Sequence, residues 1–514
     1  MPEYITRFSH ILEPVPTRDW IIISTLFIGI LILIAISEFI RRRLQWSPEF
    51  TRKLVHILVG VMMFFIPILL QTSSPMVLIA TFFIITNLFA LKKGVLKGMH
   101  GARESYGTAF YPLSFLILVL LCWPQHVVII IAAMMVLALG DAAAAIVGEA
   151  LRKPHEYILI KDQKSYEGSA TMFLTSGLAV FQILYFYPFE SGSGVQSALI
   201  AFWFAIITAI IATAAEALSG KGSDNLTVPL FTALILYYLL NHSVDENIRF
   251  SAGVALGIFA AIISFRLRFL SASGAVATFL LASIRFGFGG WKWTVPILTF
   301  FILSSLLSKV GKKLKSRYDL VFEKSSRRDF GQVLANGGIA GILMILYMFY
   351  ELQEIYILYL AALATAAADT WATEIGTLAR SKPRLITNFS SVPAGTSGGI
   401  TLLGIISATL GALTIAISGW LFFSNDFVSN TLLLVVLITF GGVVGSLIDS
   451  LFGATIQIQY RCPDCQQVTE KTHHCQGKLT NPVSGISIIN NDMVNFLSSV
   501  GVIVFLVGYY ILTS

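Results

Sequence analysis

Apolar residues fill most of the chain in long runs that short polar segments separate. A helix needs roughly 20 mostly apolar residues to cross the hydrocarbon core of a bilayer. Sixteen runs meet or approach that length, and those at 109–123 and 273–287 are the shortest. We therefore expect an all-α, polytopic transmembrane bundle of about 16 spans, at residues 20–40, 54–70, 75–91, 109–123, 126–150, 170–187, 195–217, 226–241, 249–265, 273–287, 293–308, 331–350, 353–378, 396–424, 431–455 and 493–512.

Composition supports a membrane protein and excludes an ordinary soluble one. Hydrophobic residues make up 56% of the 514 residues, and charged residues make up 12%, whereas soluble domains contain about 25% charged residues. In a soluble protein, the formal charge of +7 would point to nucleic acid. Here it fits basic loops that face an anionic membrane surface, so we expect membrane lipid and no nucleic acid as a partner.

The loops between the runs predict which side of the membrane each one faces. If the spans alternate in direction, thirty of the 35 Lys and Arg residues fall on one side, which the positive-inside rule identifies as the cytoplasm. The other five are Arg7, Arg18, Arg249, Arg285 and Lys292. We therefore expect both termini to lie outside. The first residues lack the patterns of signal and transit peptides. We expect a prokaryotic cell (inner) membrane, with the loops that carry the motifs in the cytoplasm.

Five features recur in the same order in the two halves of the chain. Arg103 to Gly107 resembles Arg328 to Gly331, and in each half an acid, Asp141 or Asp369, stands seven residues before a glycine on a small-residue helix. A loop rich in Gly and hydroxyl residues follows, where Gly168 lies 27 residues after Asp141 and Gly395 lies 26 after Asp369. Then come Glu216 or Asp449, and Asp224-Asn225 or Asn491-Asp492. This order predicts two homologous domains, 1–245 and 246–514.

Carboxylates at the predicted cytoplasmic ends of spans are the main candidates for chemistry. Charges near a hydrocarbon boundary are costly and usually functional. Oxygen ligands hold Mg²⁺, and the backbone N–H groups at a helix N-terminus hold phosphate, so the pattern predicts a site for a polyphosphate with Mg²⁺. We expect catalytic acids at Asp141, Glu216, Asp369 and Asp449, which with Asp492 would hold Mg²⁺. We expect nucleotide-binding residues at Lys164, Ser165, Gly168, Ser169, Lys221, Asp224, Asn225, Arg328, Asn336, Glu374, Lys382, Gly395, Thr396, Ser397, Asn491 and Asp492.

Other readings of these residues stay open. Small residues let transmembrane helices pack closely, and this explains the alanines beside the acids without any role in binding. Asp141, Asp369 and Asp449 are different, because Ser or Asn would pack there with a smaller penalty. His56 is either a catalytic base or an interfacial anchor.

The second half carries about 35 additional residues, in a predicted cytoplasmic loop at 456–490. Cys462 and Cys465 have the Cys-x2-Cys spacing of a zinc half-site. His473 and Cys475 would complete a tetrahedral structural Zn²⁺ site, although their spacing departs from the usual second half-site. Such an ion would fold the loop, since no general base for hydrolysis stands nearby in the sequence.

These motifs resemble two families of isoprenoid kinases. Residues 50–230 resemble the dolichol kinase and phytol kinase family, in Arg52-Lys53-x-x-His56, Gly140-Asp141-Ala-x-Ala, Lys164-Ser-x-Glu-Gly168-Ser169, Glu216 and Asp224-Asn225-x-x-Val-Pro229. Residues 270–510 resemble the family that includes phytyl-phosphate kinase, in Ala368-Asp369-Thr370-x-Ala-x-Glu374-x-Gly376, Val392-Pro-Ala-Gly395-Thr-x-Gly398-Gly399, Asp449-Ser450 and Asn491-Asp492-x-Val-Asn495.

The resemblance implies two divergent repeats of a CTP-transferase-type membrane domain. The first would phosphorylate an isoprenoid alcohol of the phytol, geranylgeraniol or farnesol class with CTP and Mg²⁺, and the second would convert the monophosphate to the diphosphate. One departure is Glu149, which follows Gly148 where the first family often continues with a basic turn. Which basic residue meets the phosphates is therefore open.

Two other functions fit parts of the same pattern. A cytidylyltransferase that forms a CDP-lipid would use the same metal and nucleotide apparatus, but it would release pyrophosphate in place of CDP. A transporter built from repeats would also carry intramembrane carboxylates. Transporter sites lie near the midplane, whereas these acids are expected near one face.

Overall fold

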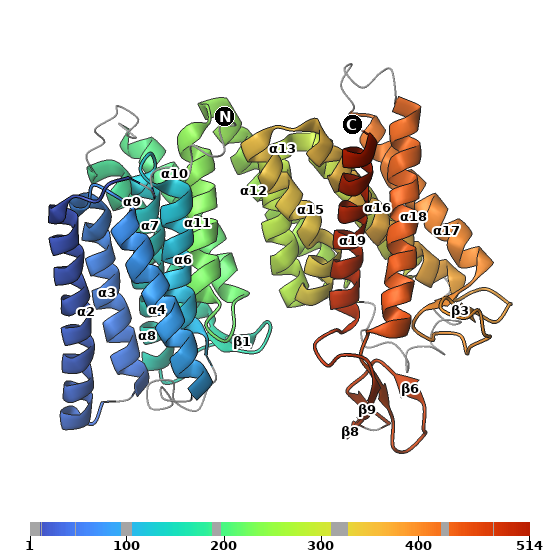
Figure 1. Cartoon of the computed structure of the whole chain (residues 1–514), viewed down its shortest axis with the longest axis horizontal. Helices are drawn as coiled ribbons and strands as arrows, with labels where there is room; N and C mark the ends of the chain where they lie inside the picture. The colour runs from blue at the N-terminus through green and yellow to red at the C-terminus, as the bar shows by residue number, and fades with distance from the viewer. Residues whose placement is uncertain are drawn as a thin grey trace. The chain divides into compact units, whose positions relative to one another are not determined.

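The computed structural model describes residues 11, 13–46, 48–93, 105–187, 197–309, 327–422, 431–475 and 477–513. The side chains of residues 48–50, 52 and 513 are not described. The predicted extracellular termini and Arg103 lie outside the described residues. The chain forms two compact units, Met1–Asn247 (unit 1) and Ile248–Ser514 (unit 2), and each is described by itself (Figure 1).

Unit 1 consists almost entirely of helices. Its most buried segment is an α-helix that passes through a π-helical turn and continues as a second α-helix, formed by α7 (Val127–Met135), η2 (Val136–Asp141) and α8 (Ala142–Ala150). The surrounding helices are α2 (Thr17–Leu44), α3 (Pro48–Leu69), α4 (Ser74–Lys93), α6 (Gly107–Cys122), α9 (Tyr166–Phe186), α10 (Ala198–Ala217) and α11 (Asp224–Asn241).

Unit 2 is organised around α16 (Gln353–Gly376), in which residues 360–364 are almost inaccessible to solvent. Small residues allow close helix packing here, and an added Cβ at Gly442 would lie 2.8 Å from the Cβ atoms of Ala364 and Ala412. The other helices are α12 (Val244–Arg266), which starts at the boundary between the units, α13 (Ala272–Leu307), α15 (Phe330–Tyr350), α17 (Leu402–Trp420), α18 (Thr431–Thr455) and α19 (Asn491–Thr513).

Helix α13 is a hairpin of two helical legs. Its backbone leaves the helical region at Gly290, where φ is +61°, a conformation that glycine adopts at little cost. The second leg returns toward the start of the first, because the ring of Phe301 lies 6.3 Å from that of Phe269, which precedes α13. The two predicted spans at 273–287 and 293–308 are these legs.

The prediction of an integral membrane helical protein is confirmed. Among the described residues, 12 helices are long and apolar enough to cross a membrane, and two shorter apolar helices, Lys53–Leu69 and Gly107–Cys122, accompany them. Each predicted span falls on a helix, with α7, η2 and α8 acting as one span and α13 as two. Large apolar side chains such as Leu199 and Leu432 are almost fully exposed, as expected for surfaces that face lipid.

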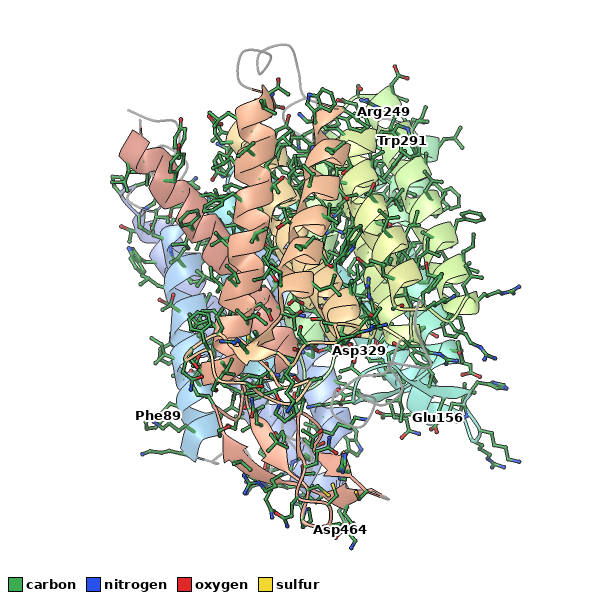
Figure 2. The ribbon with its side chains drawn as sticks, turned by 90° about the vertical axis from the view of Figure 1, so that its right-hand side faces the viewer. Phe89, Glu156, Arg249, Trp291, Asp329 and Asp464 are labelled. Atoms are coloured by element: carbon green, nitrogen blue, oxygen red, sulfur yellow. The ribbon has the colours of Figure 1, made fainter. Side chains whose placement is uncertain are left out.

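Short antiparallel strands occur at the helix ends. In unit 1, β1 (Glu156–Ile158) pairs with β2 (Gln163–Ser165). In unit 2, β3 (Arg384–Leu385) pairs with β4 (Gly399–Ile400), β5 (Gln459–Arg461) lies between β6 (Val468–Thr469) and β9 (Asn481–Ser484), and β7 (His473–His474) pairs with β8 (Lys478–Leu479). Figure 2 shows Arg249 and Trp291 at one end of unit 2, with Asp329 and Asp464 toward the other.

Candidate functional site

The predicted residues of unit 1 gather where α8, β2, α10 and α11 meet. Lys164 donates to the carboxylate of Glu216 and, at 2.5 Å, to the backbone carbonyl of the same residue. Asp224 and Asp141 also act electrostatically on the Lys164 amine. Burial opposes the charge on this amine, but the three carboxylates outweigh burial and raise the pKa of Lys164 above its usual value. Among the described residues, Lys164 is therefore a cation that these three acids share.

Asp141 is the last residue of the π-helical turn η2, which sets its position in the cluster. Single π-helical turns inside α-helices are frequent at functional sites. The neighbouring Gly140 allows α9 to approach closely, since an added Cβ there would lie 2.5 Å from Ser176 Oγ and 2.8 Å from Met172 Sδ.

The predicted phosphate turn of unit 1 forms the N-terminus of α9. Ser165 is the N-cap, and its Oγ accepts a hydrogen bond of 3.1 Å from Gly168 N, so its side chain already satisfies an end group of the helix. Ser169 Oγ lies 2.6 Å from Tyr157 Oη. Gly168 has little room for a side chain, because an added Cβ would lie 3.0 Å from the carbonyl oxygen of Ala144.

Two further predicted residues of unit 1 make local contacts. Asn225 donates its side-chain amide to Asp224 Oδ1 and to the carbonyl oxygen of Gly222. Lys221 has a left-handed backbone with φ of 53°, and its backbone N–H donates to Asp162 Oδ2 at 2.7 Å. Its side chain is exposed, so this lysine lies at the edge of the cluster.

Lys53 and His56 of the Arg-Lys-x-x-His motif contact the same central span of unit 1. Lys53 is buried and forms an ion pair of 2.5 Å with Glu149 of α8. His56 Nε2 lies 3.4 Å from the carbonyl oxygen of Leu137 in η2, and its ring packs edge-on against Tyr111. This motif therefore joins α3 to the segment that carries Asp141.

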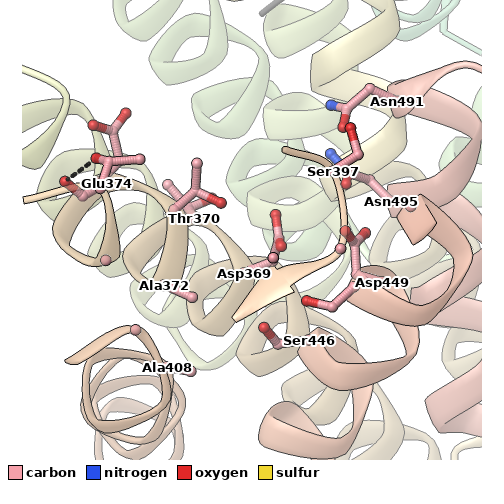
Figure 3. A pocket seen from close by; sticks show the side chains of 18 of the residues that line it. Asp369, Thr370, Ala372, Glu374, Ser397, Ala408, Ser446, Asp449, Asn491 and Asn495 are labelled. Atoms are coloured by element: carbon pink, nitrogen blue, oxygen red, sulfur yellow. Dashed lines mark hydrogen bonds between the residues drawn. The ribbon is translucent and has the colours of Figure 1, made fainter. Parts of the chain in front are cut away.

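Unit 2 contains a cavity of about 690 Å³, lined by the ends of its helices and by the loops that connect them. Asp369 from α16 and Asp449 from α18 both line this cavity, and their carboxyl groups lie next to each other (Figure 3). Most predicted residues of the second half line the same cavity, namely Arg328, Asn336, Asp369, Glu374, Gly395, Thr396, Ser397, Asp449 and Asn491.

Three oxygen atoms in the lining of this cavity are buried and accept no hydrogen bond from any described residue. They are Asp449 Oδ2, Asn495 Oδ1 and Gln332 Oε1. A buried polar atom without a partner is costly, so the cavity is suited to a ligand that presents donors or a cation to these oxygens. Carboxylate and amide oxygens are the donor atoms that Mg²⁺ prefers, and the residues present therefore fit that ion.

Arg328 supplies positive charge to the cavity of unit 2. Its guanidinium carbon lies 5.3 Å and 5.9 Å from the ring centroids of Phe300 and Phe301, which is the range of cation–π contacts. Burial lowers the pKa of Arg328, while Glu374 opposes that change, and the guanidinium stays charged at neutral pH.

Two residues that were predicted to bind the nucleotide, Lys382 and Asp492, are not among the residues that line the cavity. Lys382 is exposed, although the adjacent Pro383 is part of the lining. Asn491 and Asn495 line the cavity from the first turn of α19, whereas Asp492 is not among the lining residues. Residues four apart share a face of a helix, and a step of one residue turns Asp492 about 100° away from it.

The structure corrects the residue pairing between the two halves. Thr401 Oγ1 is the N-cap of α17 and accepts from Gly404 N at 3.0 Å, as Ser165 does from Gly168 in α9. An added Cβ at Gly404 would lie 3.4 Å from the carbonyl oxygen of Ala372. Ala144 and Ala372 each follow their acid, Asp141 or Asp369, by three residues. The counterpart of Gly168 is therefore Gly404, and the predicted pairing with Gly395 is wrong.

The loop that contains Gly395 instead lies on α18. Gly395 and Gly398 have φ of 88° and 79°, which favours glycine. An added Cβ at Gly398 would lie 2.5 Å from Ala454 Cβ and 2.7 Å from the carbonyl oxygen of Ser450. Ser397 Oγ donates to Glu470 Oε1 at 2.9 Å.

The Cys/His loop brings four side chains together. The ligand atoms of Cys462, Cys465, His474 and Cys475 all lie within 4.8 Å of one another. The prediction of His473 as a ligand is corrected to His474, because adjacent residues of a strand point to opposite sides and His473 is the exposed one. Backbone N–H groups of Cys465 and Asp464 lower the pKa of Cys462 to about 6.

Several residues of the cavity in unit 2 were not predicted from the sequence. They include Ser446, Gln457, Glu470 and Lys471. Glu470 Oε1 accepts from Ser397 Oγ and, at 2.8 Å, from Gln457 Nε2. Glu470 and Lys471 belong to the Cys/His loop, and no motif or spacing in a single sequence links that loop to Asp369.

Comparisons with known proteins identify a membrane protein family. The family model of the integral membrane protein DUF92 matches residues 255–503, which lie in unit 2. Protein PGR of Arabidopsis thaliana is 34% identical over 268 residues, which cover 47% of this chain and 91% of that protein. A phytol kinase of Synechocystis sp. is 32% identical over 230 residues, which cover 44% of this chain and 94% of that protein.

An uncharacterized membrane protein of Methanocaldococcus jannaschii is 34% identical over 217 residues, covering 42% of this chain and 86% of that protein. No solved structure matches the chain.

Proposed function

The chain belongs to the DUF92 family of integral membrane proteins, and from this premise we propose that it is a bifunctional isoprenoid kinase. Unit 1 would phosphorylate an isoprenoid alcohol of the phytol, geranylgeraniol or farnesol class, and unit 2 would phosphorylate the resulting monophosphate. CTP would be the phosphoryl donor, with Mg²⁺. The similarity to a phytol kinase over 94% of that protein supports a membrane kinase with an isoprenoid substrate.

One observation carries the proposal for unit 2. Asp369 and Asp449 lie next to each other in a cavity where Asp449 Oδ2, Asn495 Oδ1 and Gln332 Oε1 are buried without hydrogen-bond partners among the described residues. Asp449 and Asn495 would hold Mg²⁺ through these oxygens together with the carboxylate of Asp369, and Arg328 would contact phosphate. When bound, Mg²⁺ neutralises charge on the triphosphate and on the group in transfer.

Unit 1 offers the corresponding groups for the alcohol. Asp141, Glu216 and Asp224 would hold the metal and nucleotide, and Lys164 would contact phosphate while Glu216 fixes its amine. The alcohol oxygen would form a bond to the γ-phosphorus of CTP, the bond from that phosphorus to the β,γ-bridging oxygen would break, and CDP would leave. The hydroxyl proton would pass to the carboxylates of the cluster.

Apolar side chains in unit 2 lie beside the polar ones, as a lipid phosphate requires. Ile405, Val443 and Leu447 line the cavity together with the acids. Ile405 belongs to a face of α17 on which Leu402 and Ile406 are also exposed. An isoprenoid chain could therefore remain in the bilayer along α17 while its phosphate reaches Asp369 and Asp449. In the second transfer, a phosphate oxygen of the monophosphate would attack the γ-phosphorus of CTP, and CDP would again leave.

The direct test uses the purified full chain with CTP, Mg²⁺ and a panel of farnesol, geranylgeraniol and phytol, with the products resolved as mono- and diphosphates. The proposal predicts formation of both products and release of CDP. Pyrophosphate release with a CDP-lipid would instead identify a cytidylyltransferase. Absence of any CTP-dependent product with the whole panel would contradict the kinase.

A further inference from the structure

The Cys/His group has the spacing of a tetrahedral metal site. His474 Nδ1 lies 3.4 Å from Cys465 Sγ and 3.2 Å from Cys475 Sγ. With Zn–N bonds of about 2.0 Å and Zn–S bonds of about 2.3 Å, tetrahedral geometry places nitrogen and sulfur ligands roughly 3.5 Å apart. Three thiols and one imidazole form a ligand set typical of structural Zn²⁺ sites.

The backbone around the first two cysteines forms a tight turn. Gln466 N donates to the carbonyl oxygen of Cys462 at 3.0 Å, and Cys462 N donates to that of Gln467 at 3.0 Å. Gln466 is in the left-handed region, with φ of 60°. Such a turn directs both thiols to the same side, where β7 presents His474.

The loop at 456–490 has little apolar core of its own. Its strands contain two to four residues, and Val468, Leu479, Ile486 and Ile488 are exposed. Segments this short rarely fold on buried apolar area alone and usually need a disulfide or a metal. A metal ion bound by Cys462, Cys465, His474 and Cys475 would provide that constraint.

Two residues between the halves of the ligand set face the cavity of unit 2. Glu470 and Lys471 lie after Cys465 and before His474 in the sequence, and both line the cavity. Glu470 Oε1 accepts from Ser397 Oγ at 2.9 Å and from Gln457 Nε2 at 2.8 Å. These bonds connect the loop to the turn that contains Gly395 and Gly398.

Unit 1 provides a comparison for Lys471. There, Lys164 stands 23 residues after Asp141 and lies among the carboxylates. By the pairing of the N-caps Ser165 and Thr401, the position of Lys164 corresponds to Ile400 of β4, and Lys382, which precedes the partner strand β3, is exposed. Unit 2 therefore has no lysine in the corresponding strand, whereas Lys471 of the Cys/His loop lines its cavity.

We propose that Cys462, Cys465, His474 and Cys475 bind one Zn²⁺, and that this ion holds Glu470 and Lys471 in the wall of the cavity of unit 2, where Lys471 contacts the phosphates of the ligand. The part that concerns phosphate rests on the proposed function, while the metal site and the placement of the loop do not. Glu470 is a positioning residue that fixes the turn at Ser397 through its hydrogen bond.

The metal site is tested by the zinc content of the purified full chain. We expect one Zn²⁺ per chain, loss of the metal in Cys465→Ser and in His474→Ala, and full retention in His473→Ala, which changes the adjacent exposed histidine. A zinc-free wild type, or equal metal loss in His473→Ala and His474→Ala, would overturn the site.

The placement of the loop is tested by hydrogen exchange of residues 393–399 and 456–490 in the same variants. Loss of zinc should accelerate exchange in both segments, because the bond from Ser397 to Glu470 no longer holds. Unchanged exchange at 393–399 in the zinc-free Cys465→Ser variant would overturn the positioning role. The zinc content and the hydrogen-exchange rates test the metal site and the placement of the loop independently of CTP binding.

The role of Lys471 is tested by the binding of CTP with Mg²⁺ to Lys471→Gln. We expect an affinity about 10- to 100-fold lower, with the zinc content unchanged. The matched control is Lys478→Gln, which changes an exposed lysine of the same loop that pairs with Asp464. Equal affinities of Lys471→Gln and the wild type would overturn the phosphate contact, whereas no CTP binding by the wild type would instead contradict the proposed function.

Discussion

Asp369 on α16 and Asp449 on α18 lie next to each other in one cavity, 80 positions apart in the sequence. Two adjacent carboxylates, one with a buried oxygen that accepts no hydrogen bond from a described residue, repel each other unless a cation or a proton is bound between them. The pair is therefore the most direct structural indication of a metal and phosphate site in unit 2.

The two acids should have separable roles. Asp369→Asn keeps the volume of the side chain but removes its charge, so phosphorylation of the monophosphate should fall at least about 100-fold. Phosphorylation of the alcohol should be nearly unchanged in this variant, and Asp141→Asn should give the reverse pattern. Each step is measured with its own lipid substrate, and equal loss of both steps in either variant would contradict two separate sites.

The Lys164–Glu216 pair should matter for stability as well as activity. Only 13% of the lysine side chain and 9% of the glutamate side chain are exposed. Breaking a buried pair from one side costs about 3–5 kcal/mol, so Lys164→Met should lower the thermal unfolding temperature and the rate of alcohol phosphorylation.

The combined Lys164→Met and Glu216→Gln variant should recover much of that stability but none of the activity. The exposed His155–Glu167 pair provides the control, because a surface pair contributes about 0–1 kcal/mol. A similar loss of stability in His155→Ala and Lys164→Met would argue against the buried pair.

The charge of Lys164 should not limit activity near neutral pH. The pKa of this amine is raised in the folded protein above 10.5, so the stabilisation from its ion pair is complete below that value. It is lost only as the pH rises through the higher folded-state pKa. Stability of unit 1 should therefore show no transition from Lys164 between neutral pH and 10.5, which thermal unfolding across that range would detect.

Close packing between α16 and α18 should tolerate no side chain at Gly445. An added Cβ would lie 2.3 Å from Thr365 Oγ1, and overpacking of this kind costs about 1–3 kcal/mol. Gly338→Ala is the matched control within a helix, since its Cβ would meet only Leu334 Cβ at 4.0 Å. Gly445→Ala should lower the unfolding temperature in detergent, while Gly338→Ala should not. An unfolding temperature that falls for Gly338→Ala but not for Gly445→Ala would contradict the described packing.

The sequence was sufficient to locate the helices and to single out acids that the fold brings together, but not to predict tertiary contacts. Each predicted apolar run falls on a helix, because a helix that crosses a bilayer needs about 20 mostly apolar residues. The pairing of Gly168 with Gly395 was wrong because sequence does not distinguish a glycine at a helix contact from one with positive φ. Gly404 was identified only by its cap, Thr401.

The Cys/His loop shows the same limit. Alternation within a strand of two residues is invisible in the sequence, so His473 was predicted in place of His474. Glu470 and Lys471 meet Ser397 and the cavity through folding of the loop alone. Ser397 and Glu470 are 73 positions apart, and no helical or strand periodicity in the sequence predicts a contact between them.

The measurement closest to the central claim follows the phosphorus atoms of CTP. The purified chain is supplied with Mg²⁺, an isoprenoid alcohol, and CTP labelled either at the γ- or at the α-phosphate. The account predicts that γ-label appears in the lipid monophosphate and then in the diphosphate, while α-label stays in CDP. Transfer of α-label to lipid with release of pyrophosphate, or no transfer of either label, would contradict it.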